Sequence, residues 1–203
     1  MHVPKRISRC LRIAGAFLVL MASGGARGQA PEVSPKQSPS PPGKEHHLRL
    51  YNTHTGERID ILYRRGDLYI SDALAKLDHF LRDHRTGDVR PFDPRLYDIL
   101  SDLTASLGQP GAEIDIVCGY RTSSTNETLR AHTTGVAKNS LHIQAEAIDL
   151  RMPGMETLKL RQAALALNRG GVGYYPHSDF IHVDVGRVRQ WCFECPGSLL
   201  AGD

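Results

Sequence analysis

The alternation of apolar and polar residues along the chain predicts two β-hairpins. Residues 47–52 and 57–63 alternate on either side of a glycine-containing turn, which is typical of two antiparallel strands. Residues 171–175 and 180–184 are two further short apolar runs around a turn at Pro176. We therefore expect one hairpin near the start of the folded domain and another near its end.

Between the hairpins, three stretches have the apolar spacing of amphipathic helices. Residues 71–81 begin with a serine suited to an N-cap, and residues 93–103 begin with an aspartate N-cap followed by proline at the first helical position. Residues 155–168 carry four leucines and end just before two glycines. A shorter helix is expected around residues 127–131. We expect the longer helices to cover the core.

Two single strands complete the pattern. Residues 113–118 alternate and are rich in β-branched residues, and residues 147–150 form another short apolar run. The chain contains no internal repeat and no sign of a second domain. Together these elements predict an α+β fold with a small antiparallel sheet flanked by helices.

The first thirty residues have the order of a secretory signal peptide. Basic residues precede the apolar run 13–22, and small and polar residues follow it as far as Ala30, where we place the cleavage site. The apolar run is well short of the ~20 residues that span a bilayer. We therefore expect residues 1–30 to direct export and the mature protein to have no stable membrane insertion.

The remainder of the chain is predicted to hold a linker and one domain. Residues 31–46 are rich in proline and serine and bury too little to offset their ordering entropy, so we interpret them as a linker to a domain over 47–203. The net charge of +3 is small, and no stretch interleaves basic with aromatic residues. This excludes the usual pattern of a nucleic-acid-binding protein.

Three cysteines remain after removal of the signal peptide. In an oxidising compartment, Cys192 and Cys195 could close a small C-terminal disulfide loop and leave Cys118 reduced and buried in its strand. The Cys-x-x-Cys pair could instead bind zinc, but a structural zinc site would need further ligands and there is no second pair. We therefore predict a disulfide-closed tail.

Two histidines and two aspartates near the last strands suggest a metal site. Imidazole and carboxylate are ordinary zinc ligands. If the strand of Asp149 lies beside that of His182, then His142, Asp149 and His182 supply three ligands and leave a fourth position for water, as in a catalytic zinc site. Asp184 faces the same side as His182 and would orient a ligand or transfer a proton. Taken alone, Asp149 also suits a turn cap and His182 a core histidine.

Several segments closely resemble the MepK-type murein endopeptidases: residues 118–126, 135–142, 144–151 and 170–191. These enzymes belong to the LAS group of zinc peptidases, which also includes D-Ala-D-Ala carboxypeptidases and the hedgehog signalling domain. The resemblance covers roughly residues 48–191. It implies a LAS/hedgehog-like zinc peptidase fold, Zn²⁺ as the cofactor, the peptide stems of peptidoglycan as the substrate and the periplasm as the location.

The resemblance also implies roles for individual residues. It assigns the metal to His142, Asp149 and His182 and places Arg121 in the cleft. We expect catalytic roles for Asp184 and Arg121, and substrate contacts from Arg121, Ser140, Gln144 and Tyr175. A guanidinium such as that of Arg121 can grip a substrate carboxylate with two hydrogen bonds. Many LAS enzymes end in His-x-His with the second histidine on the metal, so His142, Asp149 and Asp184 as ligands, with His182 catalytic, is the alternative.

The chain departs from the family pattern at four positions. Cys118 replaces a usual serine, Ala145 a usual glycine, and Val185 and Arg187 replace a threonine and a proline. None of these changes removes a proposed ligand. They bear on loop geometry and on the specificity of the cleft.

The sequence thus favours a zinc-dependent murein endopeptidase that hydrolyses peptide cross-links. A D,D- or L,D-carboxypeptidase that trims stem peptides is the nearest alternative, and a non-catalytic peptidoglycan-binding module with a structural metal is another. A serine hydrolase is excluded because the chain has no Gly-x-Ser-x-Gly elbow. The sequence leaves open whether 3-3 or 4-3 cross-links are cut.

Overall fold

The computed structural model describes residues 43–193 and residue 195. The predicted signal peptide and residues 31–42 of the predicted linker lie outside the described residues. The first strand begins at Glu45, two residues before the predicted start of the domain. Among the described helices, none is both long and apolar enough to cross a membrane.

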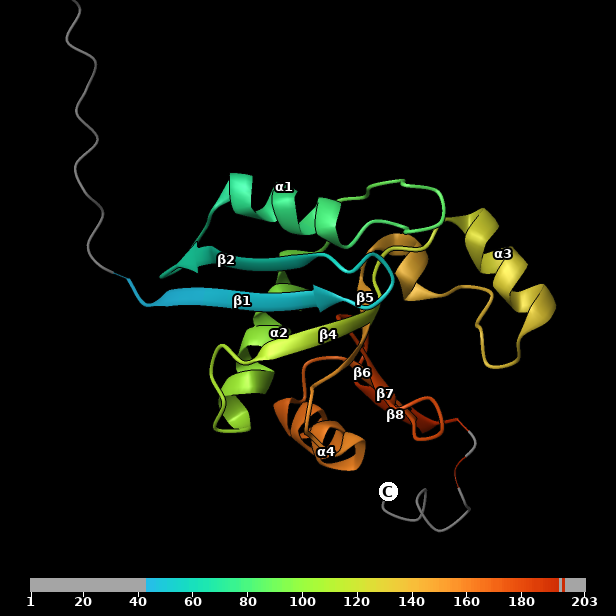
Figure 1. Cartoon of the computed structure of the whole chain (residues 1–203). Coiled ribbons are helices and arrows are strands. Elements are labelled where there is room, and N and C mark those ends of the chain that lie inside the picture. The colour runs from blue at the N-terminus through green and yellow to red at the C-terminus, as the bar shows by residue number, and fades with distance from the viewer. Residues whose placement is uncertain (1–42, 194, 196–203) are drawn as a thin grey trace, which may run out of the picture. The chain divides into compact units, whose positions relative to one another are not determined.

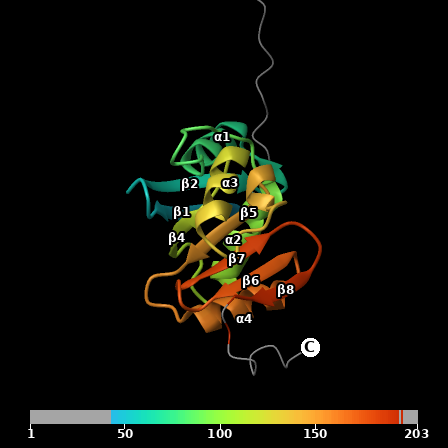
Figure 2. The same ribbon diagram turned by 90° about the vertical axis from the view of Figure 1, so that its right-hand side faces the viewer.

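One mixed sheet of eight strands forms the centre of the domain, in the order β3-β2-β1-β4-β5-β7-β6-β8. Its strands are β1 Glu45–Asn52, β2 Arg58–Arg65, β3 Leu68–Tyr69, β4 Glu113–Cys118, β5 Ala147–Arg151, β6 Gly171–Tyr175, β7 Phe180–Asp184 and β8 Arg189–Cys192. The helices are α1 Ser71–Phe80, α2 Pro94–Ser106, α3 Ser123–His132, α4 Thr157–Leu167 and a 3₁₀ helix at Leu141–Gln144. Figure 2 shows α3 in front of the sheet.

The α+β class is confirmed, but the prediction of a small antiparallel sheet is wrong in both respects. β1 and β4 are parallel because β2, β3, α1 and α2 lie between them in the chain, a connection long enough to bring the chain back to the starting end. β8 is parallel to β6 because the chain reverses after β7, the antiparallel partner of β6. Neither β3 nor β8 was predicted from the sequence.

The predicted hairpins, single strands and longer helices are confirmed with small shifts at their ends. Asp93 caps α2, and its carboxylate accepts a hydrogen bond from the amide of Arg95. Ser71 is not an N-cap: it is the first residue of α1, whose N-cap is Ile70 and has no side-chain cap. The short helix expected at 127–131 extends back to Ser123, because the hydroxyl of Thr122 caps it.

Leucine and isoleucine side chains pack between the sheet and α1, α2 and α4. The fully buried ones include Leu50 on β1, Leu77 on α1, Leu100 on α2, Ile148 on β5 and Leu160 on α4. Complete burial of one such side chain stabilises a fold by about 1.5–3 kcal/mol. Figure 1 shows α2 and α4 side by side, whereas α3 stands apart beyond the end of β4. This arrangement gives β4, β5 and β7 a rigid base beneath the site.

Candidate metal centre and cleft

The central strands and the 3₁₀ helix bring the predicted metal ligands together. Asp149 on β5 lies directly opposite His182 on β7 in the antiparallel register. His142 lies in the 3₁₀ helix that precedes β5 and is almost fully buried. Ala145 ends that helix in the left-handed region, with φ of 57°, and so turns the chain into β5. A residue with a Cβ is strained there, which explains why glycine suits this position.

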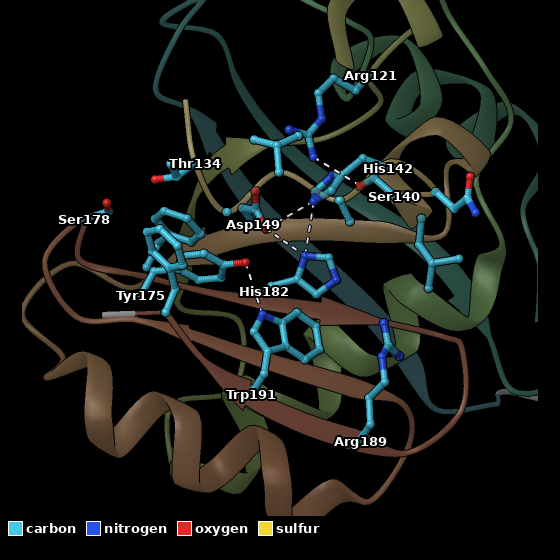
Figure 3. A pocket seen from close by; sticks show the side chains of 17 residues that line it. Arg121, Thr134, Ser140, His142, Asp149, Tyr175, Ser178, His182, Arg189 and Trp191 are labelled. Atoms are coloured by element: carbon cyan, nitrogen blue, oxygen red, sulfur yellow. Dashed lines mark hydrogen bonds and ion pairs between the residues drawn. The ribbon is translucent and has the colours of Figure 1, made fainter. Parts of the chain in front are cut away.

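Three side-chain atoms meet at one point. Nε2 of His142 is 3.1 Å from Oδ1 of Asp149 and 3.1 Å from Nδ1 of His182, and the last two atoms are 2.9 Å apart (Figure 3). Zinc bonds of about 2.0 Å at tetrahedral angles would separate their ligand atoms by about 3.3 Å. The observed triangle is therefore close in size to one face of a tetrahedral metal site.

The outer nitrogen of each histidine is held by an oxygen atom, and this sets the tautomers. Nδ1 of His142 donates to the carbonyl oxygen of Gly119 at 2.8 Å, and Nε2 of His182 donates to Oδ2 of Asp184 at 3.0 Å. The inner nitrogens then carry lone pairs that face the Asp149 carboxylate. Three buried acceptors in contact require a cation between them. Proteins commonly orient metal-binding histidines in this way.

The pKa values of the site show the same demand for positive charge. Burial by itself would lower the pKa of His142, but the Asp149 carboxylate and the Cys118 thiol beside it raise that pKa well above its usual value. Burial would raise the pKa of Asp149, yet His142 and His182 lower it strongly. A proton and a metal cation compete for such a site. The residues present therefore fit a divalent metal.

Asp184 lies behind His182, on the side of the ring away from the other two converging atoms. It is 1% exposed, and its oxygens accept from Nε2 of His182, from the amides of Gly171 and Gly186 and from the guanidinium of Arg189. Burial opposes ionisation of Asp184, but these hydrogen bonds hold its pKa well below the usual range. The bonds from Gly171, Gly186 and Arg189 thus fix the carboxylate, and the carboxylate in turn holds the His182 ring.

Cys118, which the sequence predicted to be reduced and buried in its strand, is a neighbour of the site. It is the register partner of Asp149 across β4 and β5, and its Sγ lies within 4.8 Å of ligand atoms of His142 and Asp149. The thiol is free and half-buried. Its position at the end of a predicted strand was the one sequence clue that Cys118 lies near the site. In the structure the next residue, Gly119, holds the ring of His142 through its carbonyl oxygen.

A cavity of about 290 Å³ opens over the three converging atoms. Three of the residues predicted to contact the substrate line it: Arg121, Ser140 and Tyr175. Arg121 is 8% exposed and donates to Oγ of Ser140 at 3.3 Å, while its Nε–H has no partner among the described residues. Gln144 is exposed and lines a neighbouring hollow, outside this cavity.

The wall opposite Arg121 is aromatic, and Tyr175 is the one residue of it that the sequence predicted to contact the substrate. Trp191 on β8 packs against His182 with ring centroids 5.1 Å apart and donates from Nε1 to the hydroxyl of Tyr175 at 3.1 Å. Tyr175 stacks on Phe180 at 4.4 Å. Arg189, also on β8, lies over the Trp191 ring (Figure 3). Its guanidinium also donates a hydrogen bond to Asp184. The roles of Trp191 and Arg189 were missed because β8 itself was not predicted.

Comparison with known proteins places this site in a family. The family model described as peptidoglycan L,D-endopeptidase MepK matches residues 40–191. The probable peptidoglycan L,D-endopeptidase MepK of Haemophilus influenzae is 44% identical over 144 residues, which cover 71% of this chain and 77% of that protein. No solved structure gives a significant match.

Two further relatives agree with this assignment. The proteins of Escherichia coli K12 and Shigella flexneri named peptidoglycan L,D-endopeptidase MepK are each 44% identical over 144 residues, covering 71% of this chain and 79% of their own. The family match includes every residue that lines the cavity as far as Trp191. The chain therefore belongs to the MepK family of peptidoglycan L,D-endopeptidases, which are metallopeptidases.

Proposed function

We propose that this protein is a zinc-dependent endopeptidase that hydrolyses L,D peptide cross-links in bacterial peptidoglycan. The observation that carries the proposal is the convergence of three buried acceptor atoms, from His142, Asp149 and His182, on the floor of a cavity. The relatives are named as peptidoglycan L,D-endopeptidases, which supports both the substrate and the type of bond. We also infer that the domain has the LAS/hedgehog-like zinc peptidase fold.

Zinc is the metal that the donor set favours. Two imidazole nitrogens and one carboxylate oxygen are typical of catalytic zinc sites, which leave one coordination position free. When bound, zinc supplies Lewis-acid polarisation of the scissile carbonyl and lowers the pKa of water. Cys118 is close enough to compete as a softer ligand, but His182 completes the tighter triangle.

The remaining residues of the site bind the peptide or position the side chains around it. The guanidinium of Arg121 lines the cavity, where a stem-peptide carboxylate would accept hydrogen bonds from its terminal nitrogens. Ser140 holds the guanidinium in place, and Tyr175 offers a hydroxyl and a ring face on the other side. Asp184 keeps the outer nitrogen of His182 protonated, so we assign it to positioning and not to proton transfer.

The proposed substrate agrees with the sequence prediction for the N-terminus. Peptidoglycan lies outside the cytoplasm, so an enzyme that acts on it must be exported. We propose that residues 1–30 act as the export signal and that the mature enzyme works in the periplasm. Residues 31–44, which precede β1, would link the cleavage site to the domain.

A hydrolysis assay on purified sacculi tests this function. The zinc-loaded chain is expected to release monomeric muropeptides from L,D-cross-linked sacculi, and His142→Ala is expected to abolish release. His47→Ala, which removes an exposed histidine on β1, serves as the matched control and should be fully active. The function is refuted if the zinc-bound chain leaves both sacculi and short stem peptides intact.

The same assay separates the two other functions. A carboxypeptidase would release a terminal amino acid from free stem peptides and leave cross-linked dimers whole. A wall-binding module would bind sacculi equally well after His182→Ala or chelation and would hydrolyse nothing.

A further inference from the structure

The cavity has one wall that the family match does not include. The match ends at residue 191, and the next residues are closed into a small ring by a disulfide between Cys192 and Cys195, as the sequence predicted. Phe193 lies inside this ring and lines the cavity. Its amide donates to the carbonyl oxygen of Tyr174 at 2.9 Å, which ties the ring to the end of β6.

Phe193 joins two segments at the cavity that are far apart in the sequence. Its ring packs near that of Tyr175, with centroids 5.8 Å apart. On the other side it touches Gly135, in the loop that follows α3: a Cβ on Gly135 would lie 2.7 Å from the Phe193 ring. Gly135 also has φ of 81°, so glycine fits this position both for its backbone and for the space that Phe193 occupies.

The loop that Phe193 contacts leads directly to the site. Residues 134–137 and 139 line the same cavity, and Ser140 and His142 follow them. A side chain that fixes this loop against β6 therefore sets the width of the cleft without contacting the three metal-binding atoms. The contact is apolar and aromatic, which suits an uncharged stretch of peptide.

We propose that Phe193, held in place by the Cys192–Cys195 disulfide, is a specificity-determining residue that forms one wall of the cleft for the cross-linked peptide. This inference rests on the proposed function, because the peptide is the occupant of the cleft. The carboxylate of the peptide binds Arg121, and the Phe193 ring contacts the apolar part of the chain. The disulfide keeps that ring between Gly135 and Tyr175.

Steady-state kinetics on a defined cross-linked muropeptide dimer test the role of the side chain. Phe193→Ala should raise KM roughly tenfold, the effect of losing one well-packed aromatic contact. It should leave kcat and zinc affinity within about twofold, and Phe193→Tyr should restore KM. Unchanged KM in Phe193→Ala, or an equal loss of kcat and zinc binding, overturns the proposal.

The role of the disulfide is tested by replacing both of its cysteines with serine. The double variant Cys192→Ser, Cys195→Ser should raise KM in the same direction, and adding Phe193→Ala to it should raise KM by less than in the parent chain. Val89→Ser is the control, because Val89 is an exposed apolar residue outside the cavity lining and its replacement leaves the disulfide intact. If the double variant keeps the parent KM, the disulfide does not position Phe193 and the proposal is wrong.

A readout independent of activity separates this proposal from the proposed function. Hydrogen–deuterium exchange of the amides in residues 133–139 should become faster in Phe193→Ala and in the double cysteine variant, even if the chain hydrolyses nothing. Exchange rates equal to those of the parent chain would refute the contact itself. If the parent chain is inactive but exchange is still faster in these variants than in the parent, only the proposed function is refuted.

Discussion

Replacing Asp184 by asparagine tests how His182 is held. In the parent chain, the two carboxylate oxygens accept one hydrogen bond from His182, two from Arg189 at 3.0 and 2.7 Å and two from backbone amides. Asparagine has the same shape but only one acceptor oxygen. In one orientation its NH₂ group faces the N–H of His182, and in the other it faces the backbone amides. All of these groups are hydrogen-bond donors, so either orientation places two donors against each other and loses hydrogen bonds.

The structure sets the size of the effect on metal binding. A charge-assisted hydrogen bond contributes about 1.5–3 kcal/mol, and removal of the partner of a metal-binding histidine typically lowers metal affinity or activity by about 10–100-fold. That range corresponds to about 1.4–2.7 kcal/mol, so the two estimates agree. We expect Asp184→Asn to weaken zinc binding by about 10–100-fold and to recover most of its kcat at saturating zinc.

Chelator competition for zinc, combined with kcat at saturating zinc, measures both quantities. Asp115→Asn is the control, because Asp115 is a buried carboxylate paired with Arg151 on the neighbouring strands and makes no contact with the three converging atoms. If Asp184 were a general base, kcat would fall by about 10²–10⁴-fold with zinc affinity unchanged. If it were a ligand, zinc binding would be lost. Either result refutes the positioning role.

Three further predictions concern residues around the cleft. Arg121→Lys should lower kcat/KM by about tenfold or more, through a higher KM, on a substrate with a free stem-peptide carboxylate, because lysine cannot form the two-pronged hydrogen bond. It should have little effect on the same substrate with that carboxylate amidated, and equal losses on both substrates would contradict this role. Cys118→Ser should change zinc affinity by less than about threefold, as measured by chelator competition, because a thiol outside the tighter triangle is not a ligand; a loss of tenfold or more would make it one. Asp83, which is fully buried, tests pH dependence: burial opposes its ionisation, but hydrogen bonds from Thr125, Thr122 and Arg85 lower its pKa. Because its folded pKa is lower than its unfolded value, Asp83 stabilises the chain above about pH 4 and this contribution disappears as pH falls through the folded pKa. Asp83→Asn should therefore lower the free energy of unfolding, measured with urea, by about 1–3 kcal/mol at pH 7 and by progressively less in acid. A loss of unfolding free energy that does not change with pH would refute the assignment.

The parts of the fold that depend on local pattern could be predicted from the sequence. The two hairpins and the longer helices follow from apolar periodicity, turn residues and caps such as Asp93. β3 and β8 could not be predicted, because each is short and is stabilised mainly by pairing with a strand placed by the rest of the fold. The parallel pairings were missed for the same reason, since a sequence pattern does not show which strands become neighbours.

The candidate site shows the same division. His142, Asp149 and His182 carry their chemistry in the residue type, so their spacing and family resemblance sufficed to propose them. Gln144 points elsewhere because the 3₁₀ helix has three residues per turn, which puts residues two apart on different faces and buries His142 while exposing Gln144. Arg189 resembles any surface cation in the sequence, and only the fold places its guanidinium on Asp184.

Hydrolysis of a purified L,D-cross-linked muropeptide dimer in H₂¹⁸O, followed by mass spectrometry, tests the central claim most directly. We predict that the zinc-loaded chain converts the dimer into two monomers, with one ¹⁸O atom in the newly formed carboxylate, and that His182→Ala with the same zinc leaves the dimer intact. A parent chain that binds one zinc ion and leaves the dimer unchanged would contradict the account.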